Sequence, residues 1–407
     1  MTTVSTTSAP AAGVSPAASD TRGFLIAALV VHLSAPQAFI TAPVFVEAMV
    51  KWIGLTPAEA GYVQAAESLG KAVAAIGLLF LVQQVDWRRL ARLALALLAI
   101  GNVLTIWVSD FYALVVVRFI CGMAPGFVVP IAYAMIGMTA QRERNFGWLL
   151  TTLLTYGALA FTVLPWLFGR FGIAGGLLFY ASFAVIGLLF TRAVPSVSGD
   201  DRAERAAIDG VAKPVLPTSL RVPTVLTLAF YFIGMSGAWA YFSLIAGAGG
   251  IAESSVASVL ATSQLFGILG GLLVVATGDR LGRVGPIATG LLATVAAMLL
   301  LSGQVSLAMF TVSALAFAFF WNHTHPYLLS AISSLDSRGR LVVYATVAQM
   351  CGIAIGPAIA ARLLGEGADY RRVVIACAVS LCVALVCILP ALLWQRRSTA
   401  IERSGAD

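Results

Sequence analysis

The chain has 407 residues, of which 60% are hydrophobic and only 11% are charged, and its formal net charge is +7. A soluble protein of this length needs more charge to cover its surface, so the composition excludes a soluble globular fold. The mean hydropathy of +0.94 indicates that most of the chain lies in lipid. Because about 20 mainly apolar residues span a bilayer, the length allows a dozen spans with short connections.

Apolar stretches, taken in chain order, predict twelve membrane-spanning helices and therefore an all-α membrane protein. Residues 1–22 precede the first span and are rich in Ala, Ser, Thr and Pro, which predicts a disordered cytoplasmic tail and not a cleaved signal peptide. Pro36 and Pro43 predict bends in the first span. The predicted spans are 23–48, 58–82, 89–108, 111–138, 145–168, 173–192, 221–247, 253–276, 285–303, 306–333, 338–364 and 369–394.

One connection, residues 193–220, is much longer than the others. It contains the charged stretch 200–205 and two prolines, Pro214 and Pro217. Such a linker after the sixth span divides the chain into two six-helix halves, residues 23–192 and 221–394. Residues 395–407 form a second predicted tail.

The basic residues predict the orientation in the membrane, because Lys and Arg accumulate in cytoplasmic loops. With the N-terminus inside, eighteen of the 25 Lys and Arg residues lie in cytoplasmic segments, five in external segments and two within spans. Both termini are therefore predicted to be cytoplasmic, in the cytoplasmic (inner) membrane. Since topology accounts for the basic excess, the net charge does not indicate a nucleic-acid partner.

Two kinds of motif stand out in this layout. Residues 278–283, between spans eight and nine, read Gly-Asp-Arg-Leu-Gly-Arg, and residues 86–89, between spans two and three, read Asp-Trp-Arg-Arg as a degenerate copy. Span four contains Arg118, Gly122 and Gly126 in the spacing Arg-x-x-x-Gly-x-x-x-Gly. Together with the layout of six spans, a linker and six spans, these motifs resemble the major facilitator superfamily.

The resemblance implies two pseudo-symmetric six-helix bundles, a functional monomer, and a cavity lined by helices 1, 4, 7 and 10. It also implies that the charged loops stabilise one conformation, which gives a gating role to Asp86, Arg88, Asp279, Arg280 and Arg283. The Gly-Pro motif that many drug antiporters carry in helix five is missing, since span five has only Gly157 and a distant Pro165. This difference counts against a standard drug antiporter.

Glycine pairs one helical turn apart predict close helix packing. The pairs are Gly122/Gly126, Gly267/Gly271 and Gly352/Gly356. Small faces of this kind let helix backbones approach each other in lipid. They support either tight packing alone or packing that takes part in gating.

Three charged residues, Glu67, Lys71 and Arg118, lie well inside predicted spans. A charge at the bilayer centre costs at least ~2.5–3.5 kcal/mol, so such residues face the bundle interior and usually have a function. Gln64, Glu67, Ser68 and Lys71 share one face of span two, and the spacing predicts a Glu67–Lys71 ion pair. That pair is either structural or the proton-coupling site. Arg118 either binds an anionic substrate, relays protons with Glu67, or hydrogen-bonds carbonyl groups.

Polar and aromatic residues inside the spans are the candidates for substrate contact. Asn322 and His323 lie in a polar, aromatic cluster before Pro326, and His325 follows His323 at about 200° around the helix, which argues against a two-histidine metal site. We predict no metal site. The predicted substrate-binding residues are His32, Gln37, Gln64, Arg118, Tyr156, Trp239, Gln264, Asn322, His323 and Gln349.

The sequence indicates a secondary transporter that uses no cofactor and is not an enzyme. It contains no ATP-binding motif, no His-Glu-x-x-His and no Cys-x-x-Cys, and its loops are too short and too poor in His, Asp and Glu to form a catalytic cluster. The leading prediction is alternating access with proton-coupled symport of a small organic anion. An aromatic anion is one candidate substrate. The alternative is a proton-coupled antiporter that exports amphiphilic drugs or metabolites, and sodium is the other candidate ion.

Overall fold

The computed structural model describes residues 21–81, 84–196, 216–278, 280–335, 340–365 and 369–404, and these are almost entirely helical. The first half contains α2 (Arg22–Leu33), α3 (Gln37–Ile40), α4 (Ala42–Ala48), the π-helix η1 (Met49–Ile53), α5 (Pro57–Leu81), α6 (Trp87–Thr105), α7 (Phe111–Gly137), α8 (Arg142–Phe171), α9 (Ile173–Phe190) and the 3-10 helix η2 (Thr191–Ala193). The second half contains α11 (Thr218–Ala248), α12 (Glu253–Thr277), α13 (Val284–Leu299), α14 (Leu307–Ser334), α15 (Arg340–Leu364) and α16 (Tyr370–Ser404).

Nine helices within the described ranges are long and apolar enough to cross a membrane. Three further spans differ from this pattern for local reasons. The first is divided into α2, α3 and α4, the third (α6) carries three arginines near its start, and the ninth (α13) has 16 residues. Together these elements make the twelve predicted spans, which confirms the predicted fold class.

The predicted tails and linker lie partly outside the described residues. Residues 1–20, 197–215 and 405–407 are not described, and α16 continues beyond the predicted end of span twelve to Ser404. The predicted linker 193–220 therefore stays a prediction over residues 197–215.

Prolines interrupt the first span where bends were predicted. Pro36 precedes α3, and Pro43 lies in the first turn of α4. A proline lacks the backbone N–H that a continuous helix needs, so carbonyl groups near it lose their partners. The Gln37 side-chain amide donates to the Leu33 carbonyl in place of a backbone donor. The Gln37 carbonyl keeps its bond from the Thr41 backbone N–H at 3.1 Å and gains a second from the Thr41 hydroxyl at 2.9 Å. The result is a short four-residue helix, α3, at the centre of the first span.

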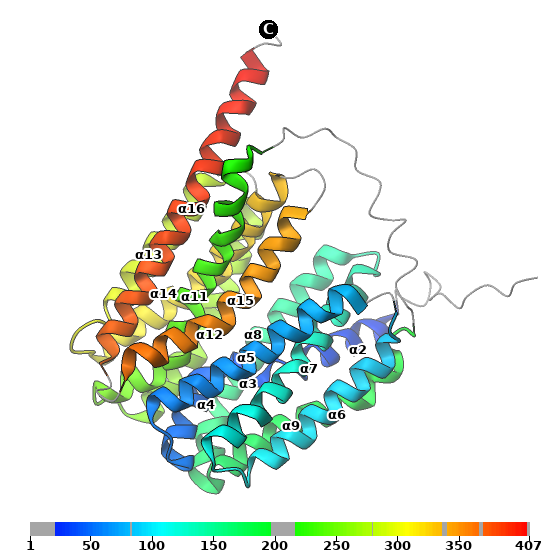
Figure 1. The fold of residues 1–407 in the computed structure, drawn as a ribbon, viewed down its shortest axis with the longest axis vertical. Coiled ribbons are helices and arrows are strands. Elements are labelled where there is room, and N and C mark those ends of the chain that lie inside the picture. The colour runs from blue at the N-terminus through cyan, green and yellow to red at the C-terminus, as the bar shows by residue number, and fades with distance from the viewer. Residues whose placement is uncertain are drawn as a thin grey trace, which may run out of the picture.

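The twelve spans form two bundles, α2–α9 and α11–α16, with matching internal packing (Figure 1). In the first bundle α5 packs on α7, α6 on α7 and α6 on α9. The equivalent helices of the second bundle pack in the same way: α12 on α14, α13 on α14 and α13 on α16. This repetition gives the chain its pseudo-symmetry.

Glycines allow the closest helix contacts in each bundle. A Cβ atom at Gly122 of α7 would overlap the Glu67 carbonyl of α5, and one at Gly70 of α5 would overlap the Phe119 carbonyl of α7. In the second bundle a Cβ at Gly270 of α12 would overlap the Phe319 carbonyl of α14 in the same way. These contacts fit the role of small residues in membrane helix packing.

The two bundles converge around α4 and diverge toward the C-terminal end of α16 (Figure 1). Bonds that cross between the bundles in the described part of the chain lie in the converging half. The Lys51 ammonium pairs with Glu253 at 2.5 Å, the Tyr241 hydroxyl donates to the Pro57 carbonyl at 3.2 Å, and the Trp239 indole donates to the Phe39 carbonyl at 3.3 Å. The molecule is therefore closed at the end that the basic residues predict to be external.

Candidate functional site

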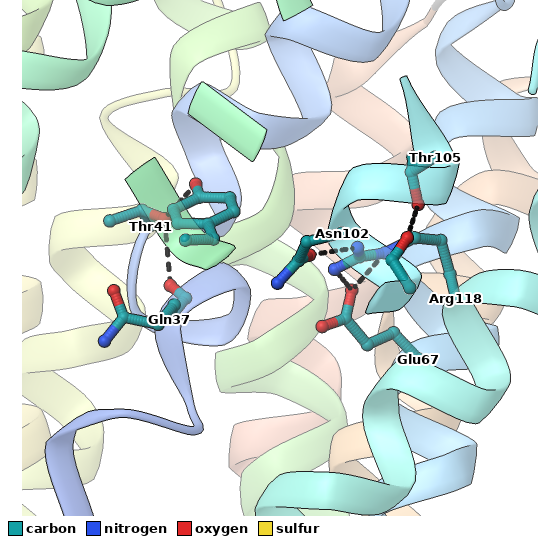
Figure 2. Close-up of polar contacts among 8 residues, drawn as sticks. Gln37, Thr41, Glu67, Asn102, Thr105 and Arg118 are labelled. Atoms are coloured by element: carbon teal, nitrogen blue, oxygen red, sulfur yellow. Dashed lines mark hydrogen bonds and ion pairs between the residues drawn. The ribbon is translucent and has the colours of Figure 1, made fainter. Parts of the chain in front are cut away.

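A buried ion pair lies inside the first bundle. Arg118 of α7 donates to the Glu67 Oε2 atom of α5 from Nη2 at 2.7 Å and from Nε at 3.1 Å. Its third nitrogen, Nη1, donates to Asn102 Oδ1 of α6 at 2.7 Å. Figure 2 shows these three side chains pointing toward one another. The Arg118 side chain is fully buried, and its guanidinium lies 4.9 Å from the centre of the Phe45 ring.

The sequence forms this pair through close packing of α5 and α7. Gly122 and Gly70 let the two backbones touch, which brings Arg118 within reach of Glu67. An isolated charge would be costly at this depth, whereas this guanidinium is paired with a carboxylate and donates a hydrogen bond from each of its three nitrogens. The second carboxylate oxygen, Glu67 Oε1, has no hydrogen-bond partner among the described residues and is the atom available to a proton.

The predicted Glu67–Lys71 ion pair is wrong. Glu67 pairs with Arg118, while the Lys71 ammonium lies 4.5 Å from the centre of the Phe39 ring and forms no ion pair within the described ranges. The physical reason is that a pair on one helix stabilises by only about 0.2–0.5 kcal/mol. Arg118 instead approaches from another helix with two donors on the same oxygen.

Lys71 lines a cavity of about 340 Å³ between α5, α7 and α15, in the diverging half of the molecule. Most of its lining is aliphatic, contributed by residues such as Leu79, Val343 and Met350. Lys71 is the one charged side chain in this lining, which also includes the polar Tyr133 and Thr346. We call this space the open-end cavity.

A second cavity of about 140 Å³ lies between the bundles, where α3 and α8 face α11, α12 and α14. Trp239 and Phe317 stack in parallel with ring centres 6.0 Å apart, and Trp321 stands edge-on to Phe317 at 5.5 Å. Phe39, Gln264 and Asn322 complete its polar and aromatic lining. We call this space the aromatic chamber.

Three predicted substrate-binding residues, Trp239, Gln264 and Asn322, line the aromatic chamber. Sequence reasoning missed its other aromatic walls, Phe39, Phe317 and Trp321. The available signal was the position of these residues in the first and tenth spans, which the family resemblance makes cavity-lining helices. We predicted no role for them because rings of this kind are abundant throughout the chain.

Other predicted residues lie nearby but outside the chamber. His32 stacks on Tyr133, an open-end cavity residue, with ring centres 5.4 Å apart. Gln37 and Gln64 are buried, and their side-chain oxygens have no hydrogen-bond partner among the described residues. Tyr156 packs against Phe179 and Phe183 inside the first bundle.

The two histidines of α14 face different neighbours, as their spacing predicts. His323 stacks on Phe319 and lies near Gly290 of α13, within the second bundle. His325 instead makes a 3.1 Å hydrogen bond with Gln349 of α15 and stacks on Tyr231 of α11. Both histidines therefore contact residues of the second bundle, and neither lines the aromatic chamber or the open-end cavity, although His323 is predicted to contact substrate.

The predicted gating residues lie at the diverging end. Asp86 accepts a bond from the Arg89 backbone N–H at 2.9 Å and so caps α6, and Arg88 donates to the Val194 carbonyl at 2.8 Å. Arg283 donates to Ser334 at 2.6 Å, and Arg280 is exposed. Asp279 lies outside the described residues. The gating role of this group stays a prediction.

Comparisons with known proteins identify the fold. A family model described as Major Facilitator Superfamily matches residues 27–247, which is 221 of the 407 residues. A comparison of the sequence with curated proteins finds no match.

Solved structures of transporters are similar over nearly the whole chain. A mutant of the nucleoside transporter NupG is 12% identical with a TM-score of 0.72, covering 91% of this chain and 100% of that one. The inward open xylose transporter XylE from E. coli is 15% identical with a TM-score of 0.69, covering 89% and 94%. A mutant of the peptide transporter POT is 13% identical with a TM-score of 0.72, covering 93% and 97%. At these identities the likeness concerns the fold alone.

Proposed function

The chain belongs to the major facilitator superfamily and is a secondary transporter, and from this premise we propose that it carries a small organic anion together with a proton. The observation that carries the proposal is the arrangement of the three intramembrane charges. Arg118 compensates Glu67, which leaves Lys71 as a cation that borders the open-end cavity without a carboxylate partner in the described chain.

The net positive charge of the site favours symport of an anion with a proton over exchange of a cation for a proton. With Glu67 ionised, the group of Glu67, Arg118 and Lys71 carries one net positive charge. Protonation of Glu67 raises this to two positive charges, which strengthens the attraction for an anion. Coupling between two ligands is reciprocal, so a bound anion also favours protonation of Glu67. Proton and anion therefore bind best together.

Glu67 suits the role of proton carrier because its two oxygens differ. Oε2 holds the Arg118 guanidinium, while Oε1 is available to accept the proton. Arg118 also keeps its bond to Asn102 when Glu67 becomes neutral, so protonation does not leave it without a partner. The site can thus change charge without losing its buried structure.

Alternating access completes the proposed cycle. The bundles rock around a midplane site, which faces one side of the membrane at a time. In the orientation predicted by the basic residues, this conformation is closed to the outside and open to the cytoplasm, as expected after substrate release. The contacts that close it are Lys51 with Glu253 and Tyr241 with Pro57.

The test is proton movement by the purified full-length protein in liposomes at fixed pH, with organic acids added outside and with sodium present or absent. We expect substrate acids to carry protons inward without sodium. The Glu67→Gln variant should lose proton movement while still exchanging labelled substrate across the membrane. The matched control is Glu59→Gln, on the same helix, where glutamine can still cap α5 in place of the Glu59 carboxylate. Normal proton coupling in Glu67→Gln would overturn the assignment.

The second candidate is a proton-coupled exporter of amphiphilic compounds. The observation that favours it is the mostly aliphatic lining of the open-end cavity. In such an exporter a cationic substrate would compete with the proton for Glu67. Cationic compounds would therefore drive protons in the opposite direction. The net positive charge of the site opposes cation binding, and for this reason we rank symport first.

A further inference from the structure

We propose that the substrate is an aromatic carboxylate that carries a polar ring substituent. Its ring would occupy the aromatic chamber, its carboxylate would pair with Lys71, and its substituent would bond Gln264 and Asn322. The inference rests on the proposed function only in taking the substrate to be an organic anion. It names the substrate class and assigns recognition to a set of residues contributed by both bundles.

The size of the aromatic chamber fits one six-membered ring. Its volume is about 140 Å³. An apolar cavity of about 150 Å³ is large enough to bind benzene. The chamber as it stands therefore has room for a single ring.

The walls of the chamber favour a flat ring over a saturated one. Trp239 and Phe317 stack in parallel, and Trp321 presents its edge to Phe317. On the side that belongs to the first bundle, Phe39 lies beside the aliphatic residues Ile40, Leu153 and Leu154. The Phe39 ring centre lies 6.3 Å from that of Trp321. Aromatic pairs in such geometries gain a further ~2–10-fold in binding beyond the burial of apolar area.

A buried amide without a partner shows where a polar substituent belongs. Gln264 is only 5% exposed, lines the chamber, and makes no side-chain hydrogen bond within the described residues. Asn322 uses its Nδ2 on the Ala318 carbonyl at 2.9 Å, which leaves its Oδ1 without a described partner. Buried polar groups are almost always hydrogen-bonded. A hydroxyl or similar group on the ring would satisfy both amides.

Phe39 connects the chamber to the charge. The Lys71 ammonium lies 4.5 Å from the centre of the Phe39 ring, and the same ring lines the chamber. A cation over an aromatic face is held by a weaker attraction than one paired with a carboxylate. When a ring enters the chamber, its carboxylate can therefore displace Phe39 and pair with Lys71. Phe39 would hold Lys71 in place while the site is empty.

The first test compares how well different compounds compete for transport by wild-type protein in liposomes. 4-Hydroxybenzoate has the aromatic ring, the carboxylate and the polar substituent, and each of the other compounds lacks one or more of these. We expect 4-hydroxybenzoate to compete best, benzoate less well, and cyclohexanecarboxylate at least several-fold less well than benzoate. Benzyl alcohol, which lacks the charge, should not compete. Equal competition by cyclohexanecarboxylate and benzoate would contradict the proposal, and this result does not depend on any variant folding.

Variants assign each feature to a residue. Gln264→Leu should abolish the preference for 4-hydroxybenzoate over benzoate while transport of benzoate continues. Lys71→Gln should lose competition by all carboxylates, and Lys71→Arg should keep it. If Gln264→Leu leaves the hydroxyl preference unchanged, the polar contact is wrong.

The two proposals fail in different ways. If aromatic acids exchange across the membrane but move no protons, the substrate class stands and proton coupling fails. If the proton movement that exceeds that of protein-free liposomes is equal with acetate and with benzoate, coupling stands and the inference fails. Both readouts come from the same liposomes.

Discussion

Replacing Glu67 with alanine tests the buried ion pair directly. The Glu67 Oε2 atom accepts two bonds from Arg118, at 2.7 and 3.1 Å, and Arg118 is fully buried. Alanine would leave the guanidinium with Asn102 as its one hydrogen-bond partner in the described chain. Breaking a buried pair by removing one partner costs about 3–5 kcal/mol, because the remaining charge is uncompensated. We therefore expect a large loss of stability.

Glutamine at the same position should cost less. Its side-chain oxygen can still accept from Arg118, and a hydrogen bond to a charged group contributes about 1.5–3 kcal/mol. Thermal unfolding in detergent should therefore rank the wild type above Glu67→Gln and Glu67→Gln above Glu67→Ala. The control variant Glu59→Gln should unfold close to the wild type.

The double variant Glu67→Leu with Arg118→Met separates structure from function. Replacing a buried pair by apolar residues of similar size is often neutral or stabilising. We expect this protein to unfold near the wild-type temperature and yet to move no protons with substrate. If Glu67→Ala is as stable as the wild type, or if the double variant unfolds earlier than Arg118→Met alone, the pairing argument is refuted.

Two further predictions concern the closed end and the helix contact. Reversing one charge of the Lys51–Glu253 pair, as in Lys51→Glu, should weaken closure. An exposed pair of this kind contributes about 0.2–1 kcal/mol, which is roughly 1.4–5-fold in the population of the closed conformation. Labelling of a cysteine at the buried Ser243 should then increase, and it should fall again when Glu253→Lys restores the pair; unchanged labelling would exclude a closing role. Gly122→Ala should impair transport and cost about 1–3 kcal/mol, since it overpacks the contact between α5 and α7. The control in unfolding and transport assays is Gly137→Ala, because a Cβ atom added at Gly137 meets no atom within 4 Å. Equal behaviour of the two variants would count against the packing argument.

The spans were predictable because they depend on local properties. A stretch of about 20 apolar residues must span the bilayer whatever its neighbours are. Prolines also predicted the bend in the first span, although its division into α2, α3 and α4 depends on how the freed carbonyls find side-chain donors. The predicted span 58–82 and the helix Pro57–Leu81 differ by a single residue at each end.

The site was less predictable because it depends on contacts between helices. Sequence spacing paired Glu67 with Lys71, but the partner of Glu67 comes from α7 at a position fixed by glycine contacts between helices. The walls of the chamber were hidden for a different reason. The chain has 22 Phe, 8 Trp and 10 Tyr, so no pattern of residue types selects Phe39, Phe317 and Trp321. The neighbours of His323 and His325 likewise depend on the rotation of α14 about its own axis.

The short helix α3 explains how one residue can connect the charge of the first bundle to the chamber. Phe39 contacts Lys71 through its ring face, borders Trp321 with the same ring, and accepts the Trp239 indole through its backbone carbonyl. In a continuous helix that carbonyl would accept from the residue four positions later, but Pro43 has no N–H to donate. The carbonyl is therefore available to the other bundle. A movement that separates the bundles here must break the bond between Trp239 and the Phe39 carbonyl. The proposed pairing of substrate with Lys71 and the closure between the bundles therefore both involve Phe39.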